Sequence, residues 1–118
     1  MKIILLMFAF ASLITTGTGD FLTGKWESKP SVKGNVTGVI FKPDNTYVGY
    51  VNKKTFVNGT YSLMDSIISI NENGCEGLTG VYKTILFSNA DSLKFQPVND
   101  SCEERKAGMS SIVLGRVK

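Results

Sequence analysis

The sequence predicts an all-β fold: an eight-stranded antiparallel up-and-down β-barrel, preceded by a signal peptide. Apolar and polar residues alternate along most of the chain after residue 19, as they do in half-buried strands. Clusters of Gly, Pro, Asn and Asp interrupt this alternation, and no connection after Val36 is long enough for a helical crossover. Closing the barrel removes both free sheet edges, although strand count alone leaves a two-sheet sandwich as the alternative.

The first four expected strands are each followed by turn-forming residues. They span residues 22–28, 36–42, 46–51 and 56–63. The second ends at Pro-Asp-Asn (43–45) and the third at Asn-Lys-Lys (52–54), because these residue types favour turns. Alternation gives these strands inward apolar residues, namely Val39, Phe41, Val57, Tyr61 and Leu63.

The last four expected strands have two longer connections between them. They span residues 66–71, 79–88, 92–98 and 109–117, and the loops at 72–78 and 99–107 each hold one cysteine. Alternation directs Ile68 and Ile70 inward from the fifth strand, and Leu93 and Phe95 inward from the seventh. The sixth and eighth strands are apolar on both faces, so their inward residues stay open.

The N-terminal segment is typical of a secretory signal peptide. Lys2 precedes an apolar run at residues 3–14, and small residues follow at 15–19. The run is shorter than the roughly 20 residues that a membrane span requires. We therefore expect a signal peptide at 1–19 and one secreted or periplasmic barrel domain at 20–118. No cysteine follows the run, so we expect no membrane anchor; a buried N-terminal helix is the alternative.

Two cysteines, Cys75 and Cys102, predict a single disulfide in an oxidising compartment. Strands of a meander run alternately up and down, so the two cysteine loops, separated by two strands, emerge at the same end of the barrel. The closed loop of about 27 residues corresponds to roughly 3.5 kcal/mol in the chain-entropy model. Two free buried thiols are the alternative.

Composition excludes several classes of function. The 118 residues include 13 Lys and Arg against 10 Asp and Glu, and this net charge of +3 is too mild to predict a nucleic-acid partner. The absence of His excludes His-based acid–base catalysis and His-ligated metals. The sequence also lacks a phosphate-binding loop and a nucleophile elbow. We therefore expect no catalytic residues, no metal site and no cofactor.

Two groups of polar residues are candidates for a site. The densest charge cluster consists of Asp100, Glu103, Glu104 and Arg105. It either binds a cation or substrate at the barrel rim, or is a solvated loop in which Arg105 offsets one carboxylate and Asp100 caps a turn. Tyr61 and Tyr82 either place hydroxyls beside an apolar ligand inside the barrel or fill the core.

The segment at residues 22–26, Leu-Thr-Gly-Lys-Trp, carries a Gly-x-Trp element on the first strand. It resembles the lipocalin and calycin barrels, in which that Trp closes one barrel end and a basic residue of the last strand packs across it. The resemblance implies structural roles for Gly24, Trp26 and the matching Arg116. The start also resembles avidin, but avidin-type biotin sites are lined by several Trp residues and this chain has one.

A second set of elements covers more of the chain. Gly-x-Tyr occurs at 59–61 and 80–82, and Asp-x-Cys-x-x-Arg spans 100–105. In this order they resemble a group of small exported bacterial lipocalin-like proteins, mostly without assigned function. Together the two resemblances extend from about Leu22 to Val117.

These features predict a binding protein that is not an enzyme. We expect a small, largely apolar ligand in the barrel mouth, with four candidate ligand-binding residues, Phe41, Tyr61, Tyr82 and Phe95. The alternative is a protein-interaction module, such as an exported inhibitor or envelope component, that uses loops 72–78 and 99–107. A third hypothesis is an enzyme that relies on Tyr, Asp or Glu in the mouth.

Overall fold

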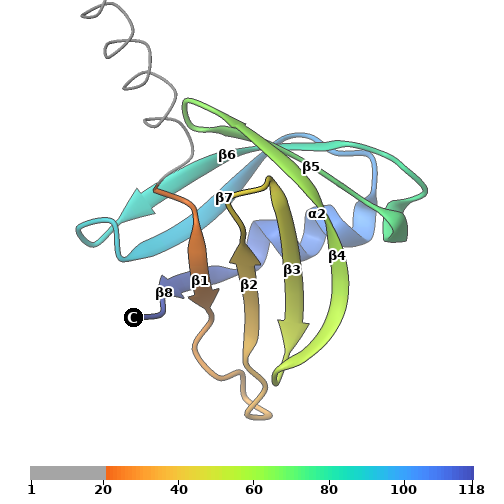
Figure 1. The fold of residues 1–118 in the computed structure, drawn as a ribbon. Coiled ribbons are helices and arrows are strands. Elements are labelled where there is room, and N and C mark those ends of the chain that lie inside the picture. Colours follow the sequence, from red (N-terminus) through yellow and green to blue (C-terminus); the bar gives the residue numbers. More distant parts are fainter. Residues whose placement is uncertain (1–20) are drawn as a thin grey trace, which may run out of the picture.

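The structure, a computed structural model, describes residues 21–118, so the signal peptide expected at 1–19 lies outside the described residues. Eight antiparallel strands follow one another around a closed barrel, and the last strand pairs with the first (Figure 1). The predicted up-and-down barrel is confirmed, and the two-sheet alternative is wrong. The strands are β1 (Gly24–Glu27), β2 (Thr37–Phe41), β3 (Thr46–Val51), β4 (Lys54–Met64), β5 (Ile67–Glu72), β6 (Gly80–Phe87), β7 (Ser92–Asn99) and β8 (Val113–Arg116).

The described chain also contains two short helical segments, η1 (Asn73–Cys75) and α2 (Glu103–Ser111). The loop expected at 99–107 and the strand expected from residue 109 are therefore wrong in this part, because α2 occupies the segment and β8 begins only at Val113. The helix packs against β7 across the barrel rim (Figure 1). Neither helical segment within 21–118 has the length and apolar character needed to cross a membrane.

One barrel end is closed by Trp26, which is fully buried on β1. Its indole nitrogen donates to the Leu22 carbonyl at 2.9 Å. The Arg116 guanidinium lies 4.2 Å from the centre of the indole ring and donates through Nη2 to the Phe21 carbonyl at 2.6 Å. Gly24, with φ +130°, occupies backbone geometry that L side chains rarely adopt. The Trp–Arg contact implied by the resemblance is thus present.

The inward side chains follow the predicted alternation. Phe41 and Tyr61 meet edge to face at 5.0 Å, and Tyr82 and Phe95 do so at 6.4 Å between ring centres. The sixth strand, which the sequence left open, directs Tyr82 and Thr84 inward, while Lys83 between them is exposed. The buried core of the described chain comprises Leu22, Trp26, Phe41, Tyr47, Tyr61, Ile68, Ile70, Tyr82, Leu93, Phe95 and Leu114.

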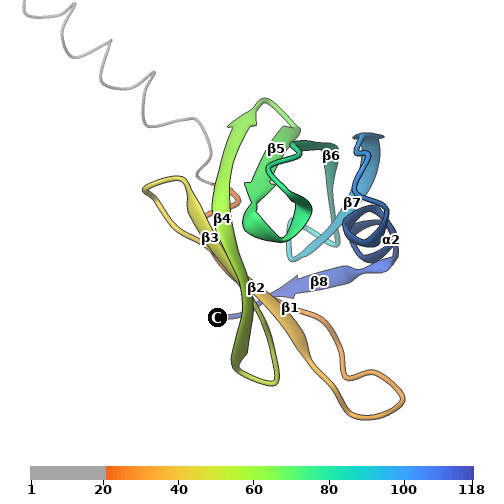
Figure 2. The ribbon, with the colours of Figure 1, turned by 90° about the vertical axis from the view of Figure 1, so that its right-hand side faces the viewer.

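The other barrel end carries the connections that follow β1, β3, β5 and β7, and we call it the mouth. Figure 2 shows η1, on the β5–β6 connection, and α2 on the same side of the barrel. Because the meander alternates direction, these connections come together at one end although they are far apart in sequence. The fold therefore leaves the mouth to be shaped by connections rather than by strands.

Candidate functional site

A cavity of about 1160 Å³ opens at the mouth. Its apolar walls come from β2, β4, β5, β7, α2 and β8, with side chains that include Val39, Phe41, Val57, Ile70, Phe95, Met109, Ile112 and Leu114. Its polar lining includes Tyr47, Glu72 and Arg105. Pockets that hold small molecules have this composition, in which apolar walls surround a few placed polar groups.

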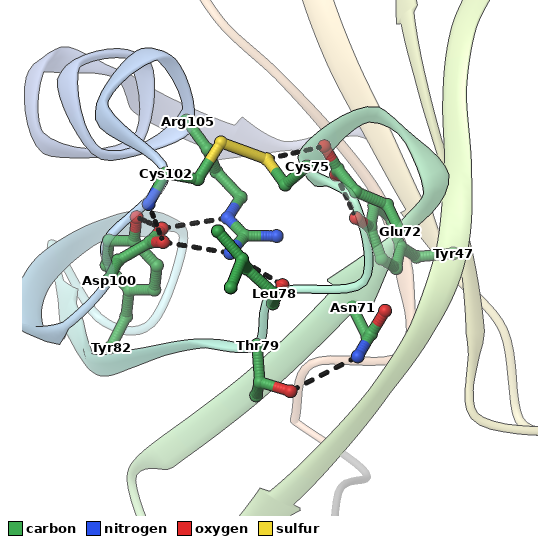
Figure 3. Close-up of polar contacts among 10 residues, drawn as sticks. All are labelled: Tyr47, Asn71, Glu72, Cys75, Leu78, Thr79, Tyr82, Asp100, Cys102 and Arg105. Atoms are coloured by element: carbon green, nitrogen blue, oxygen red, sulfur yellow. Dashed lines mark hydrogen bonds and ion pairs between the residues drawn. A yellow bond between two sulfur atoms is a disulfide. The ribbon is translucent and has the colours of Figure 1, made fainter.

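A buried ion pair holds α2 at the mouth. The Arg105 Nε donates to Asp100 Oδ2 at 2.7 Å, and Nη2 donates to Asp100 Oδ1 at 2.8 Å and to the Leu78 carbonyl at 2.9 Å (Figure 3). The Arg105 and Asp100 side chains are only 5% and 0% exposed. The solvated loop proposed for this cluster is therefore wrong for Asp100 and Arg105, which are shielded from water and join α2 to both cysteine loops. Arg105 does offset one carboxylate, as that alternative stated, and Glu103 and Glu104 are exposed.

The Asp100 carboxylate accepts two further hydrogen bonds. The Tyr82 hydroxyl donates to Oδ2, and the Cys102 backbone nitrogen donates to Oδ1 at 2.9 Å. The second bond is the turn cap predicted for Asp100. The Arg105 guanidinium is the largest influence on this carboxyl, and its hydrogen bonds hold the pKa of Asp100 at about 2. Asp100 is therefore the charged partner that makes burial of Arg105 tolerable.

The small size of Gly80 permits this cluster. A Cβ at this position would lie 2.7 Å from Asp100 Oδ2 and 3.0 Å from Arg105 Nε. Because both atoms are fixed by their ion pair, neither can move away cheaply. The first glycine of the second Gly-x-Tyr element thus has a physical explanation in this structure: it admits the ion pair against the wall of β6.

Cys75 and Cys102 form the predicted disulfide, with their Cα atoms 5.9 Å apart. The bond joins η1 to the residue that precedes α2. Loops 72–78 and 99–107 therefore share one end of the barrel, as the strand count required, and free thiols are excluded for both cysteines. The disulfide and the Arg105 ion pair fasten α2 at adjacent points.

Glu72 enters the mouth from the end of β5. Its Oε2 accepts a hydrogen bond of 2.6 Å from the Tyr47 hydroxyl (Figure 3). Its Oε1 lies 3.5 Å from the Cys75 sulfur. That sulfur is in a disulfide and has no proton to donate, so the approach is a contact and not a hydrogen bond. Burial, reinforced by the bond to Glu72, raises the pKa of Tyr47 well above its usual range, so the phenol stays protonated.

The four predicted ligand-binding residues lie in different places. Phe41 and Phe95 line the cavity. Tyr61 lies at the closed side, where it packs on Phe41 and donates to the Lys42 carbonyl at 3.0 Å. Tyr82 is fully buried, and its hydroxyl donates a hydrogen bond to Asp100. The structure thus places two of the four at the cavity, and a role in ligand binding stays a prediction for all of them.

Sequence reasoning passed over the polar residues of the mouth, Tyr47 and Glu72. The signal that was available is alternation, because Glu72 falls on the same face of its strand as Ile68 and Ile70. The structure adds the register, in which Tyr47 pairs with Gly59 and Gly59 pairs with Glu72. A carboxylate at an inward position at the end of a strand is costly without partners, and it therefore marks a site.

No three Cys, Asp or Glu side chains within residues 21–118 gather closely enough to hold a metal ion. The mouth instead offers hydrogen-bond donors and acceptors beside an apolar wall. In comparisons with known proteins, no family model matches the chain, and no curated protein matches it significantly. The eight-stranded barrel is compatible with a calycin-like fold.

Proposed function

We propose that this chain is an exported lipocalin-like binding protein that holds a small, largely apolar molecule in its mouth and catalyses no reaction. The observation that carries the proposal is the cavity of about 1160 Å³, which opens at one barrel end while Trp26 and Arg116 close the other. A cavity with mainly apolar walls suits a ligand that partitions out of water. The Gly24-x-Trp26 element supports the lipocalin-like assignment.

The chemistry of the mouth favours binding over catalysis. Tyr47 keeps its proton, because burial and Glu72 both raise its pKa, and it is therefore a poor base. Asp100 and Arg105 neutralise each other in a buried pair. Without His, the chain has no side chain whose ordinary pKa lies near neutrality to exchange protons with a substrate.

The disulfide supports export, since such bonds persist in oxidising compartments. Intact mass spectrometry of protein purified from its own host tests this part of the proposal. We expect a mass that lacks residues 1–19 and two cysteine hydrogens. A full-length, reduced chain in the cytoplasm would refute export while leaving the binding proposal to its own test.

Binding is tested by titration with an environment-sensitive apolar fluorophore. Met109 on α2 lines the cavity, whereas its neighbour Ser110 is exposed and lies outside the cavity lining. Met109→Trp fills the mouth and should weaken probe affinity by about tenfold or more, equivalent to roughly 1.4 kcal/mol. Ser110→Trp adds the same ring to the same helix and should leave affinity unchanged. Equal affinities for the two variants, or no saturable binding by the unmodified protein, would refute the proposal. In the latter case, loss of a host protein partner on mutation of the loops 72–78 and 99–107 would favour the interaction module.

A further inference from the structure

Two charged atoms in the mouth lack hydrogen-bond partners. The Nη1 of Arg105 is buried, and no described residue accepts a hydrogen bond from it. Glu72 Oε1 touches the disulfide sulfur of Cys75, which has no proton, so no donor serves this oxygen among the side chains that the structure describes. The buried guanidinium nitrogen without a partner carries a desolvation cost that a bound acceptor can relieve, and the half-buried carboxylate oxygen has room to accept from the same group.

The two atoms belong to opposite sides of the mouth. Arg105 comes from α2 and Glu72 from the end of β5, and Figure 3 shows the unused guanidinium nitrogen turned toward the side where Glu72 and Tyr47 lie. No ion pair or hydrogen bond joins the two described side chains directly. The two side chains nevertheless interact electrostatically. Asp100 is the main cause of the raised pKa of Arg105, and the negative charge of Glu72 raises that pKa further. A group bound on this side of the guanidinium would therefore face both side chains.

The charges present select the kind of group. The positive charge of Arg105 is already balanced by Asp100 at 2.7 Å, and Glu72 adds one further negative charge. An anionic head group would face this excess negative charge, and an ammonium head group has no acceptor for the unpartnered Nη1. A neutral group that accepts from Nη1 and donates to Oε1 serves both atoms and adds no charge to a buried site.

We propose that the mouth recognises an amphiphile whose apolar body contacts the cavity wall and whose neutral donor–acceptor head, such as a primary carboxamide, bridges Arg105 Nη1 and Glu72 Oε1. The carbonyl oxygen of the head accepts from the guanidinium, and its amino group donates to the carboxylate. The walls that would hold the body include Phe41, Phe95 and Met109. This inference rests on the proposed function, because it assigns a ligand class to the same cavity.

The test compares straight-chain compounds of equal length that differ only in their head: a primary carboxamide, the isosteric methyl ketone, a carboxylate and an amine. Each displaces the apolar fluorophore from the unmodified, disulfide-bonded protein. We expect the carboxamide to bind about tenfold more tightly than the ketone, since the ketone can accept from Arg105 but cannot donate to Glu72. We expect the carboxylate and the amine to bind more weakly than the carboxamide.

A variant pair ties any preference to Glu72. Glu72→Gln removes the charge and the second acceptor oxygen, so the preference for carboxamide over ketone should fall and carboxylate affinity should rise by about tenfold. Glu103→Gln removes the same charge from an exposed position of α2 outside the cavity lining and should change neither value. Circular dichroism and melting temperature confirm that both variants are folded.

The outcomes separate the two proposals. If carboxamide and ketone bind equally well, the head group does not bridge Arg105 Nη1 and Glu72 Oε1. The inference is then wrong, while the binding function stands. If the carboxylate or the amine binds most tightly, the charge argument is wrong and the proposed head group with it. If no compound in the series displaces the fluorophore and the fluorophore itself does not bind, the proposed function fails together with its ligand class.

Discussion

Asp100 offers a quantitative test of how the mouth is held together. The substitution Asp100→Asn keeps the shape of the side chain but removes the charge that balances Arg105, and it weakens the bonds from Tyr82 and Cys102. Because the Asp100 side chain is fully shielded from water, its ion pair is not screened as a surface pair would be. Removing one partner of a buried pair leaves an uncompensated charge and costs about 3–5 kcal/mol.

The pKa of Asp100 gives a second, independent value for the free energy by which this carboxylate stabilises the fold. Its hydrogen bonds with Arg105, together with those from Tyr82 and Cys102, lower the pKa from 3.8 to about 2, which corresponds to about 2 kcal/mol of folded-state stabilisation. Because the folded pKa lies below the unfolded one, this contribution is fully present above pH 4 and is lost as the pH falls from about 4 to about 2. Stability should therefore decline with acid in this window, and Asn at position 100 should remove that part of the decline.

Urea unfolding followed by the emission of Trp26, the single tryptophan of the chain, measures both effects. Asp91→Asn is the matched control. Its ion pair with Lys118 spans 3.4 Å between side chains that are 51% and 74% exposed, so it should cost under about 1 kcal/mol. If Asp100→Asn costs no more than this control, or keeps the full acid dependence, then the buried pair does not stabilise the fold as argued.

Three further predictions concern the rest of the barrel. Burial raises the pKa of Tyr47 and Tyr82 above the ordinary value of 10.0, so stability should be lost as the pH rises above about 10, and phenolate absorbance should appear together with unfolding rather than before it. Trp26→Ala should lower the free energy of unfolding by about 3–5 kcal/mol, because the ring is fully buried; a loss below about 1 kcal/mol in urea titrations would contradict its role in closing the barrel. Replacing Cys75 and Cys102 together by Ser should lower stability by about 3.5 kcal/mol, and an unchanged melting temperature would argue against this contribution.

The barrel was predictable because the sequence features that specify it are local and recur in strand after strand. Alternation and turn residues gave all eight strands, and the number of strands between the cysteine loops placed Cys75 and Cys102 on the same rim. The helix α2 was not predictable from hydrophobic period, since Arg105 is its only buried residue. A weaker signal was present: Glu103 and Glu104 in the first turn suit the positive end of a helix dipole. Tertiary contacts, rather than an apolar face, hold this helix in place.

The site was less predictable than the fold. Phe41 and Phe95 follow from alternation, and both line the cavity. Tyr61 and Tyr82 share the same inward pattern. Alternation, however, predicts neither how far a side chain lies from the mouth along the barrel axis nor which group accepts the hydrogen bond of its hydroxyl. Arg105 was expected in solvent because charged residues in a polar loop are usually exposed. Its burial depends on Asp100, and a side-chain pairing of that kind has no periodic signature.

Arg105 joins the stability of the mouth to its proposed function. Two of its guanidinium nitrogens are used by Asp100 and Leu78, and these contacts together with the disulfide hold α2 against the barrel. The third nitrogen has no partner because the orientation that satisfies Asp100 turns it toward the side of Glu72, where it is buried and no described residue accepts from it. A ligand that joins this nitrogen to Glu72 would brace α2 against β5. Binding and resistance to unfolding should therefore rise together, because a ligand that binds only the folded state stabilises that state by mass action.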